Sequence, residues 1–255
     1  MSSPLFPAVS VLEKPALAIS LSVIVPVYNE VENVGPLAHE ISLALAALGE
    51  PGEIVFVDDA SSDGTVAALC QLDLPALRVV CHTRNCGQSA AVASGMRAAR
   101  GTWVATLDGD GQNDPADLSA MLLRARQEGA DCVTGVRRRR RDNWLRRFSS
   151  RIANAFRNWI TGDHISDSGC GIRIVRRSAL LEVPVFNGMH RFLPTLLRGQ
   201  GFRVLEQEVN HRERLRGTSK YGVHNRLWRG IRDCFGIRWY LSRAVPAVRL
   251  RAQGE

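Results

Sequence analysis

Two carboxylates one residue apart, Asp108 and Asp110, follow the apolar run over residues 102–107. The run predicts a buried strand, and residues i and i+2 of an extended chain point to the same side. Both carboxylates then face one ligand at the carboxyl end of the strand, where ligands bind in open α/β sheets. Paired carboxylates without a neighbouring His or Cys suit a hard cation such as Mg²⁺ or Mn²⁺, completed by substrate phosphate oxygens. Taken alone, the pattern also fits a polar turn, because Asp and Gly both form turns.

An alternation of strand and helix patterns surrounds this pair. Short apolar or β-branched runs predict strands over residues 21–27, 53–57, 77–80, 102–107, 131–134, 172–175 and 202–209. Helical spacing predicts helices over 30–48, from 64, over 86–100 and from Asp114, with Asp114 as the N-cap and Pro115 in the first turn. Such alternation predicts an α/β fold, with a mostly parallel sheet and helices on both faces.

Composition narrows the class of partner. The chain of 255 residues carries a net charge of +8, much of it in the run Arg137–Arg141, so an anionic partner is expected: nucleic acid, phospholipid or a phosphorylated substrate. Six cysteines without a C-x-x-C pair argue against a zinc or redox site and indicate reduced, mostly buried thiols of a cytosolic protein. We expect no signal peptide and no bilayer span, since no stretch reaches about 18 apolar residues.

Four motifs occur in a characteristic order: VPVYNE over 25–30, VDDASSDGT over 57–65, Asn85 with Gly87, and LDGD over 107–110. In this respect residues 20–225 resemble the family-2 glycosyltransferases. The resemblance implies an inverting, nucleotide-sugar-dependent enzyme with the Rossmann-like glycosyltransferase A fold. The most similar subgroup is the polyprenyl-phosphate sugar transferases, which include dolichol-phosphate mannosyltransferase and bacterial undecaprenyl-phosphate enzymes.

The resemblance implies a nucleoside site on the ends of the first two strands. It assigns Pro26, Tyr28 and Glu30 to the nucleoside, and Asp59 to the base, with Asp58 as the alternative. A carboxylate at this edge accepts hydrogen bonds from a base N–H or from ribose hydroxyls. The alternative is that Asp59 only forms a turn before the next helix.

The same resemblance implies that Asp110 is a metal ligand and that Asp108 contacts the nucleotide or the metal. It also implies that Gln112 helps to hold the metal and the pyrophosphate. Gln112 as a solvated loop residue remains the alternative. A divalent ion, Mg²⁺ or Mn²⁺, would neutralise the leaving nucleoside diphosphate. Asp167 would act as a general base or orient the acceptor, and orientation is favoured if the acceptor is an already anionic phosphate.

A basic, glycine-containing loop over residues 211–222 suits closure over a pyrophosphate. The candidates for phosphate and acceptor contacts are Arg173, Arg212, Arg216, Ser219 and Lys220. An ordinary solvated basic loop is the alternative. His190 and Arg191 form a weaker acceptor-side candidate.

Residues 137–160 combine the arginine run with aromatic residues at helical spacing, and residues 223–248 form a second amphipathic segment. Basic residues beside interfacial aromatics favour an anionic membrane surface over a solvated face or a nucleic-acid patch. Many bacterial relatives carry transmembrane helices after the catalytic domain, and this sequence has none. We therefore expect peripheral docking on the inner face of the membrane, from the cytoplasm, or a membrane-protein partner.

These observations predict a metal-dependent inverting glycosyltransferase that moves a sugar from a UDP- or GDP-linked donor to a polyprenyl phosphate. The alternatives are a saccharide or lipid-A-type acceptor and, from another class, a basic membrane-binding module with a relic nucleotide site. The expected layout is a loose leader over 1–20, a catalytic domain over 21–222 and an amphipathic tail over 223–255. The sugar and the nucleotide stay open.

Overall fold

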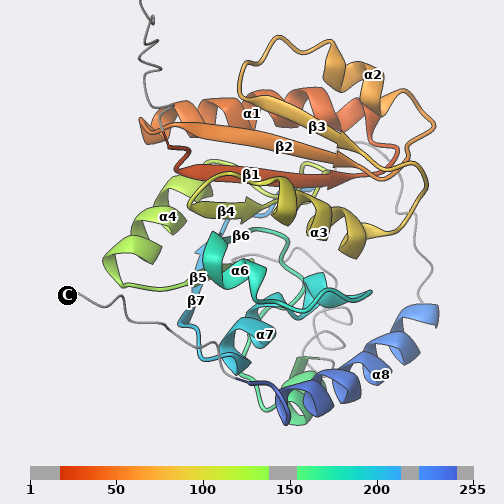
Figure 1. Cartoon of the computed structure of the whole chain (residues 1–255), viewed down its shortest axis with the longest axis vertical. Helices are drawn as coiled ribbons and strands as arrows, with labels where there is room; N and C mark the ends of the chain where they lie inside the picture. Colours follow the sequence, from red (N-terminus) through yellow and green to blue (C-terminus); the bar gives the residue numbers. More distant parts are fainter. Residues whose placement is uncertain (1–17, 138–153, 214–223, 246–255) are drawn as a thin grey trace, which may run out of the picture.

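A computed structural model describes residues 18–137, 154–213 and 224–245. Its centre is a seven-stranded sheet with the order β3-β2-β1-β4-β6-β5-β7 (Figure 1). The strands are β1 (Leu21–Val27), β2 (Gly52–Asp58), β3 (Leu77–Cys81), β4 (Trp103–Thr106), β5 (Cys132–Arg137), β6 (Arg173–Arg176) and β7 (Val204–Val209). The predicted α/β architecture is confirmed.

The sheet is mostly parallel, as the sequence predicts, with one strand reversed. β1 lies parallel to β2 and β4, whereas β6 runs antiparallel between β4 and β5. The chain winds outward from β1 to β3 and then returns to place β4 on the other side of β1. Such a reversal opens a crevice at the carboxyl ends of the strands, where ligands bind in this class of sheet.

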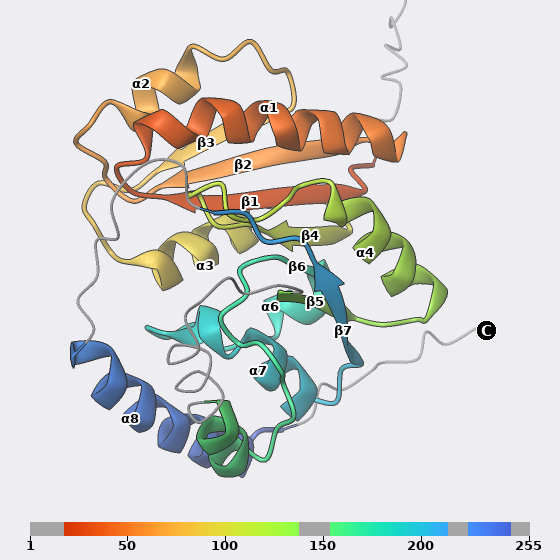
Figure 2. The same cartoon turned by 180° about the vertical axis from the view of Figure 1, so that it is seen from behind.

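Helices cover both faces of the sheet (Figures 1 and 2). They are α1 (Val31–Leu48), α2 (Thr65–Cys70), α3 (Gln88–Ala98), α4 (Asp117–Gln127), a helix over residues 154–161, α6 (Arg177–Leu181), α7 (Leu193–Gly199) and α8 (His224–Leu241). One apolar cluster packs α1 and α4 against the sheet, and a second packs α3, α6, α7 and α8 against it. The two clusters hold the strands rigid while their carboxyl ends carry the polar residues.

One predicted helix start is wrong. α4 begins at Asp117, not at Asp114, and the Asp114 carboxylate instead accepts a hydrogen bond from the backbone N–H of Ala116 (3.1 Å) in a turn before the helix. The preceding residue, Asn113, is buried, and its Oδ1 accepts the backbone N–H of Asp108 (2.9 Å). Residues 113–116 therefore close the loop that carries the two carboxylates, which delays the helix.

Three further expectations meet the structure in part. Of the predicted basic amphipathic segment 137–160, Arg137 and residues 154–160 are described: Arg137 ends β5, and residues 154–160 are helical. In the tail, α8 buries Cys234 and Ile237 in the core, so this helix is integrated with the domain. Three cysteines are buried, but Cys70, Cys81 and Cys86 are exposed. Among the described residues we find no helix whose length and hydropathy suit a bilayer crossing.

Candidate active site

The loops after β1 and β2 are tied together at the carboxyl edge of the sheet. Asn29 and Ala60 take the left-handed backbone conformation, with φ of 52° and 62°, which is uncommon for residues other than glycine. The N–H of Asn29 donates to Ser61 Oγ and the N–H of Ser62 donates to Asn29 Oδ1, both at 2.7 Å. Strained, cross-linked loops of this kind cluster at binding sites.

The residues predicted to contact the nucleoside lie on or beside these loops. Pro26 is partly buried within β1, and the side chain of Tyr28 is 37% exposed just beyond its end. Glu30 precedes α1 and accepts a hydrogen bond from Asn33 Nδ2 (2.6 Å). Asp58 is buried; its Oδ2 accepts the N–H of Ser61 (3.0 Å), and its Oδ1 has no hydrogen-bond partner among the described residues.

Asp59 is held from three sides. Its Oδ1 lies 2.7 Å from His82 Nδ1 and accepts the N–H of Cys86 (2.8 Å), while its Oδ2 accepts the N–H of Gly87 (2.7 Å). The carboxylate thus fastens the end of β2 to the loop that begins α3. This role as an organiser of backbone exists whether or not Asp59 also meets a base.

Asp108 and Asp110 lie at the end of β4 in a loop with Gly111 in the left-handed conformation. Asp108 Oδ1 accepts from Gln88 Nε2 (3.1 Å), and its carboxylate packs on Gly171, where an added Cβ would collide with it. Asp110 Oδ1 accepts the N–H of Gln112 (3.2 Å). The two carboxylates lie close enough for the charge of Asp110 to influence the pKa of Asp108; that both face one ligand stays a prediction.

The charge state of Asp108 is unusual. Burial, and next the neighbouring charge of Asp110, raise the pKa of Asp108 from 3.8 to about 6, although Arg173 and Arg137 oppose the rise. Two carboxylates that resist ionising together are stabilised by a cation between them. Oxygen ligands of this kind suit Mg²⁺ or Mn²⁺. The amide nitrogen of Gln112 donates a hydrogen bond to the carbonyl of Arg212 (3.3 Å), and the role of Gln112 as a metal ligand stays a prediction.

Asp167 forms an ion pair with Arg137. Arg137 Nε and Nη2 donate to the two oxygens of Asp167, each at 2.7 Å, and the carboxylate is buried. Arg137 was expected in a membrane-facing basic segment; this is wrong for Arg137 itself, because it ends β5 and makes a bidentate ion pair inside the protein. Arg138–Arg141 lie outside the described residues. An Asp167 engaged in this way orients Arg137 better than it removes a proton.

Arg173 begins β6 between Thr106 of β4 and Thr134 of β5. Its side chain is buried, and its Nη2 donates to the carbonyl of Ser168 (3.4 Å). Its Nε has no hydrogen-bond partner among the described residues. A buried cation with a spare donor, close enough to influence the pKa of Asp108, fits an anionic ligand.

His190, which the sequence gives only as a weaker acceptor-side candidate, contacts the start of α3 through Ser89. Ser89 Oγ, at the start of α3, accepts the N–H of Gly188 (2.7 Å) and lies 2.8 Å from His190 Nδ1. Burial, and then Arg173 and Arg191, lower the pKa of His190 to about 4, so the ring is neutral at pH 7. The neutral ring carries one proton, and its position decides whether Ser89 Oγ donates to Nδ1 or accepts from it. No sequence spacing links residues 89 and 190.

The basic loop is described as far as residue 213. Arg212 is exposed and pairs with Glu40 (2.5 Å) and Asp114 (2.8 Å), so in this state its guanidinium is held by carboxylates. Its backbone N–H donates to the carbonyl of Gln112 (2.9 Å), which ties the loop to the Asp110 segment. Arg216, Ser219 and Lys220 lie outside the described residues, and their phosphate contacts stay predictions.

Comparisons with known proteins identify the family of the chain. The model of the family described as Glycosyl transferase family 2 matches residues 22–183. The chain is 36% identical over 233 residues to a dodecaprenyl-phosphate galacturonate synthase of Rhizobium johnstonii, covering 89% of this chain and 69% of that protein. It is 35% identical over 206 residues to an undecaprenyl-phosphate 4-deoxy-4-formamido-L-arabinose transferase of Aeromonas hydrophila, covering 80% of this chain and 63% of that protein. The chain thus spans just under two thirds of the length of the latter relative.

Solved structures share the fold at low identity. A mannosyltransferase from Pyrobaculum calidifontis in complex with GDP-Man and Mn²⁺ matches with a TM-score of 0.57 at 22% identity, over 91% of this chain and 74% of that one. Glucosyl-3-phosphoglycerate synthase from Mycobacterium tuberculosis, with Mn²⁺, UDP-glucose and phosphoglyceric acid, matches with a TM-score of 0.63 at 17% identity, over 86% and 80%. The family match over most of the chain and the two close relatives establish that the chain belongs to glycosyltransferase family 2.

Proposed function

We propose that the protein transfers a sugar from a UDP- or GDP-linked donor to a polyprenyl phosphate. The observation that carries the acceptor assignment is the pair of buried or half-buried guanidinium groups beside Asp108, from Arg137 and Arg173. Arg173 has a donor to spare, and a planar guanidinium matches a phosphate. The relatives named above act on dodecaprenyl and undecaprenyl phosphates, which supports the same acceptor class here.

The chemistry follows from the charges. An oxygen of the acceptor phosphate attacks the anomeric carbon from the face opposite the donor diphosphate, and the bond from that carbon to the diphosphate oxygen breaks with its electron pair. An ionised phosphate needs no base, which accords with Asp167 being committed to Arg137. Asp108, Asp110 and Gln112 would hold a divalent cation, which would neutralise the charge on the leaving diphosphate. The loop over 211–222 is proposed to close over the donor phosphates, and the ends of β1 and β2 to hold the nucleoside.

Membrane docking is part of this proposal, because the acceptor is a lipid. Phe156 and Trp159, on the helix over 154–161, are 39% and 76% exposed, and Phe235 and Trp239, on α8, are 58% and 65% exposed. The two helices lie side by side at the end of the molecule away from α2 (Figures 1 and 2), joined by a hydrogen bond from Arg238 to the carbonyl of Ile160 (2.9 Å). Aromatic side chains on basic helices favour the headgroup region of a bilayer.

The transfer assay uses radiolabelled UDP- and GDP-sugars with purified protein, Mn²⁺ and polyprenyl phosphate in detergent. We expect label to enter the lipid fraction with one donor class and to require the acceptor phosphate. Transfer to saccharides or lipid A but not to polyprenyl phosphate would replace the acceptor assignment. Binding of lipid without turnover of any donor would favour the relic-site alternative.

Vesicle flotation tests the docking face. Trp159→Ser with Trp239→Ser should reduce binding to vesicles that contain phosphatidylglycerol by about tenfold or more, because each large apolar side chain contributes about 1.5–3 kcal/mol when buried. The control is Leu123→Ser, an exposed apolar residue of α4 on another part of the molecule. Equal loss in the control and in the aromatic pair would remove the docking role.

A further inference from the structure

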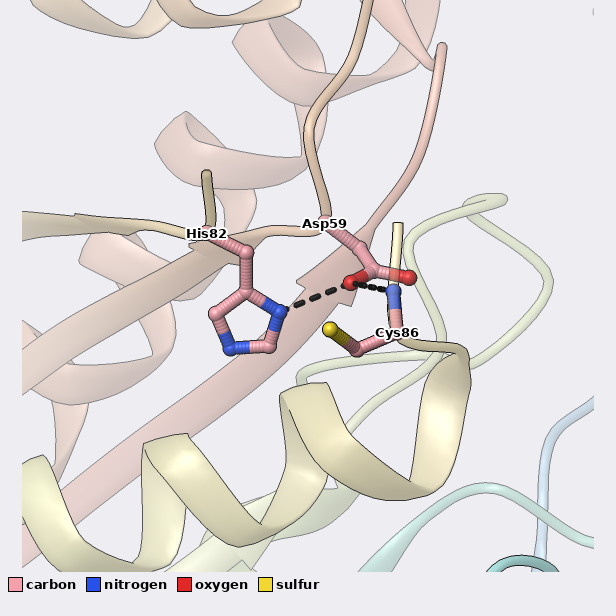
Figure 3. Close-up of side chains that lie close together, drawn as sticks. All are labelled: Asp59, His82 and Cys86. Carbon is pink, nitrogen blue, oxygen red and sulfur yellow. Dashed lines mark hydrogen bonds and ion pairs between the residues drawn. The ribbon is translucent and has the colours of Figure 1, made fainter. Parts of the chain in front are cut away.

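A second group of potential metal ligands lies apart from the Asp108 loop, at the ends of β2 and β3. It consists of Asp59, in the loop after β2, and of His82 and Cys86, which both lie in the loop between β3 and α3 (Figure 3). One carboxylate oxygen, one imidazole nitrogen and the thiol sulfur lie within 4.8 Å of one another. In Figure 3 the imidazole and the thiol both turn toward the Asp59 carboxylate. Sulfur, nitrogen and oxygen thus converge on one point.

The three side chains are oriented by other groups. His82 Nε2 lies 2.9 Å from Ser94 Oγ on α3, which leaves Nδ1 facing Asp59 Oδ1 at 2.7 Å. The other carboxylate oxygen, Asp59 Oδ2, accepts the N–H of Gly87 (2.7 Å). Metal-binding His and carboxylate groups characteristically have such outer hydrogen bonds, which fix the ring and the carboxylate in place.

A cation can reach this group of ligands from solvent on the side of Cys86. The side chains of Asp59 and His82 are 4% and 15% exposed, whereas Cys86 is exposed. A cation that enters from the Cys86 side meets the half-buried His82 and the buried Asp59 and keeps a position open to water. Three protein ligands with one open position form a recurrent zinc arrangement.

We propose that Asp59, His82 and Cys86 form a binding site for Zn²⁺ that is separate from the oxygen-only site at Asp108 and Asp110. Thiolate and imidazole ligands select zinc over Mg²⁺ and Mn²⁺, which prefer carboxylate and phosphate oxygens. Binding requires a modest spreading of the Asp59–His82 contact and release of the Cys86 thiol proton, so zinc affinity rises with pH.

The consequence for transfer rests on the proposed function, in which Asp59 borders the nucleoside. Zinc on Asp59 competes with the hydrogen bonds that hold the backbone of Cys86 and Gly87. The loop that begins α3, which also carries Gln88 to Asp108, would shift with it. Zinc at this site therefore inhibits transfer even when Mn²⁺ is in excess.

The binding test uses the metal alone, with Co²⁺ as a coloured substitute for Zn²⁺. We expect the thiolate-to-cobalt absorption band with wild type, its loss in Cys86→Ser, and a zinc affinity at least tenfold weaker in that variant. Cys70→Ser, which alters an exposed cysteine outside the group, should keep both. Circular dichroism checks that both variants are folded. A band that survives in Cys86→Ser, or that is absent from the wild type, overturns the site.

Inhibition is measured separately, by adding Zn²⁺ to the transfer reaction with Mn²⁺ in excess. Cys86→Ser should need at least ten times more zinc for half-inhibition than wild type or Cys70→Ser. Equal sensitivity in all three proteins contradicts the inhibitory role. The cobalt band is read without substrate, so an absence of transfer would count against the proposed function and leave the band as the test of the zinc site.

Discussion

Asp59 and Asp108 are carboxylates on the same edge of the sheet, on either side of β1, but their surroundings differ. Asp59 receives two backbone N–H groups and faces the imidazole of His82. Asp108 accepts a side-chain hydrogen bond from Gln88, and burial together with the charge of Asp110 raises its pKa to about 6. The first carboxylate stabilises the loops around it. The second is kept at a cost in stability, which is the pattern expected of a group that awaits a ligand.

The largest effect on transfer is expected at Asp108 and Asp110, the proposed cation ligands. Asp110→Asn removes a charge from the proposed metal site without changing its shape, and should lower transfer at least about a hundredfold, since such charge stabilisation is worth several kcal/mol. Asp73→Asn, an exposed change elsewhere, is the control. Initial rates at saturating Mn²⁺ measure the effect, and a variant within threefold of wild type would refute the metal assignment.

A smaller effect is expected on the acceptor side. Arg173→Lys keeps the charge but loses the planar pair of donors, and should lower kcat/KM for polyprenyl phosphate by about 10–100-fold, because hydrogen bonds to charged groups contribute about 1.5–3 kcal/mol. Nucleotide affinity should stay unchanged. The matched control is Arg176→Lys on the same strand, which pairs with Asp131 and stacks on Trp103. If donor affinity falls instead, Arg173 serves the donor.

Substitutions of the two carboxylates should change the free energy of unfolding in opposite directions. In metal-free protein at pH 7, Asp59→Asn should lower the free energy of unfolding by about 1–3 kcal/mol, through lost hydrogen bonds to Cys86 and Gly87. Asp108→Asn should raise it by about 1–3 kcal/mol, because ionising a group whose pKa is raised destabilises the folded state. The Asp108 effect should vanish near pH 4, where the folded protein carries the proton. Urea denaturation with EDTA measures both, and two changes of the same sign would remove the contrast.

Proton competition should appear in metal binding. The folded pKa of Asp108 is about 6 without metal, so the carboxylate carries a proton below that pH and must release it to bind a cation. Mn²⁺ affinity should be nearly constant from pH 8 to 7 and fall by up to about tenfold per unit below pH 6. Calorimetric titrations across this range measure it. A flat profile down to pH 5 would mean that Asp108 is not a ligand.

Part of the fold and of the candidate site could be predicted from the sequence alone. β1 to β4 and their helices follow from local periodicity, because each parallel strand is a short apolar run flanked by an amphipathic helix. The reversed β6 does not, since a four-residue strand has no pattern that encodes its direction. Asp108 and Asp110 were predictable as neighbours in sequence on one strand end.

Long-range partners were not predictable in the same way. The pair Arg137–Asp167 and the bond between Ser89 and His190 join residues 30 and 101 positions apart. Likewise, Asp59, His82 and Cys86 show no metal-ligand spacing, and they meet because β2 and β3 are neighbours whose ends lie beside the start of α3. The sequence showed which groups could do chemistry, whereas the packing of the sheet decided which of them meet.

The most direct test of the central claim is Mn²⁺ binding by electron paramagnetic resonance, with and without UDP or GDP. We expect one bound Mn²⁺ per wild-type chain in the presence of the accepted nucleotide. That ion should be lost in Asp108→Asn and Asp110→Asn and retained in Cys86→Ser. Full Mn²⁺ binding by both aspartate variants would contradict the assignment of Asp108 and Asp110 as the cation site.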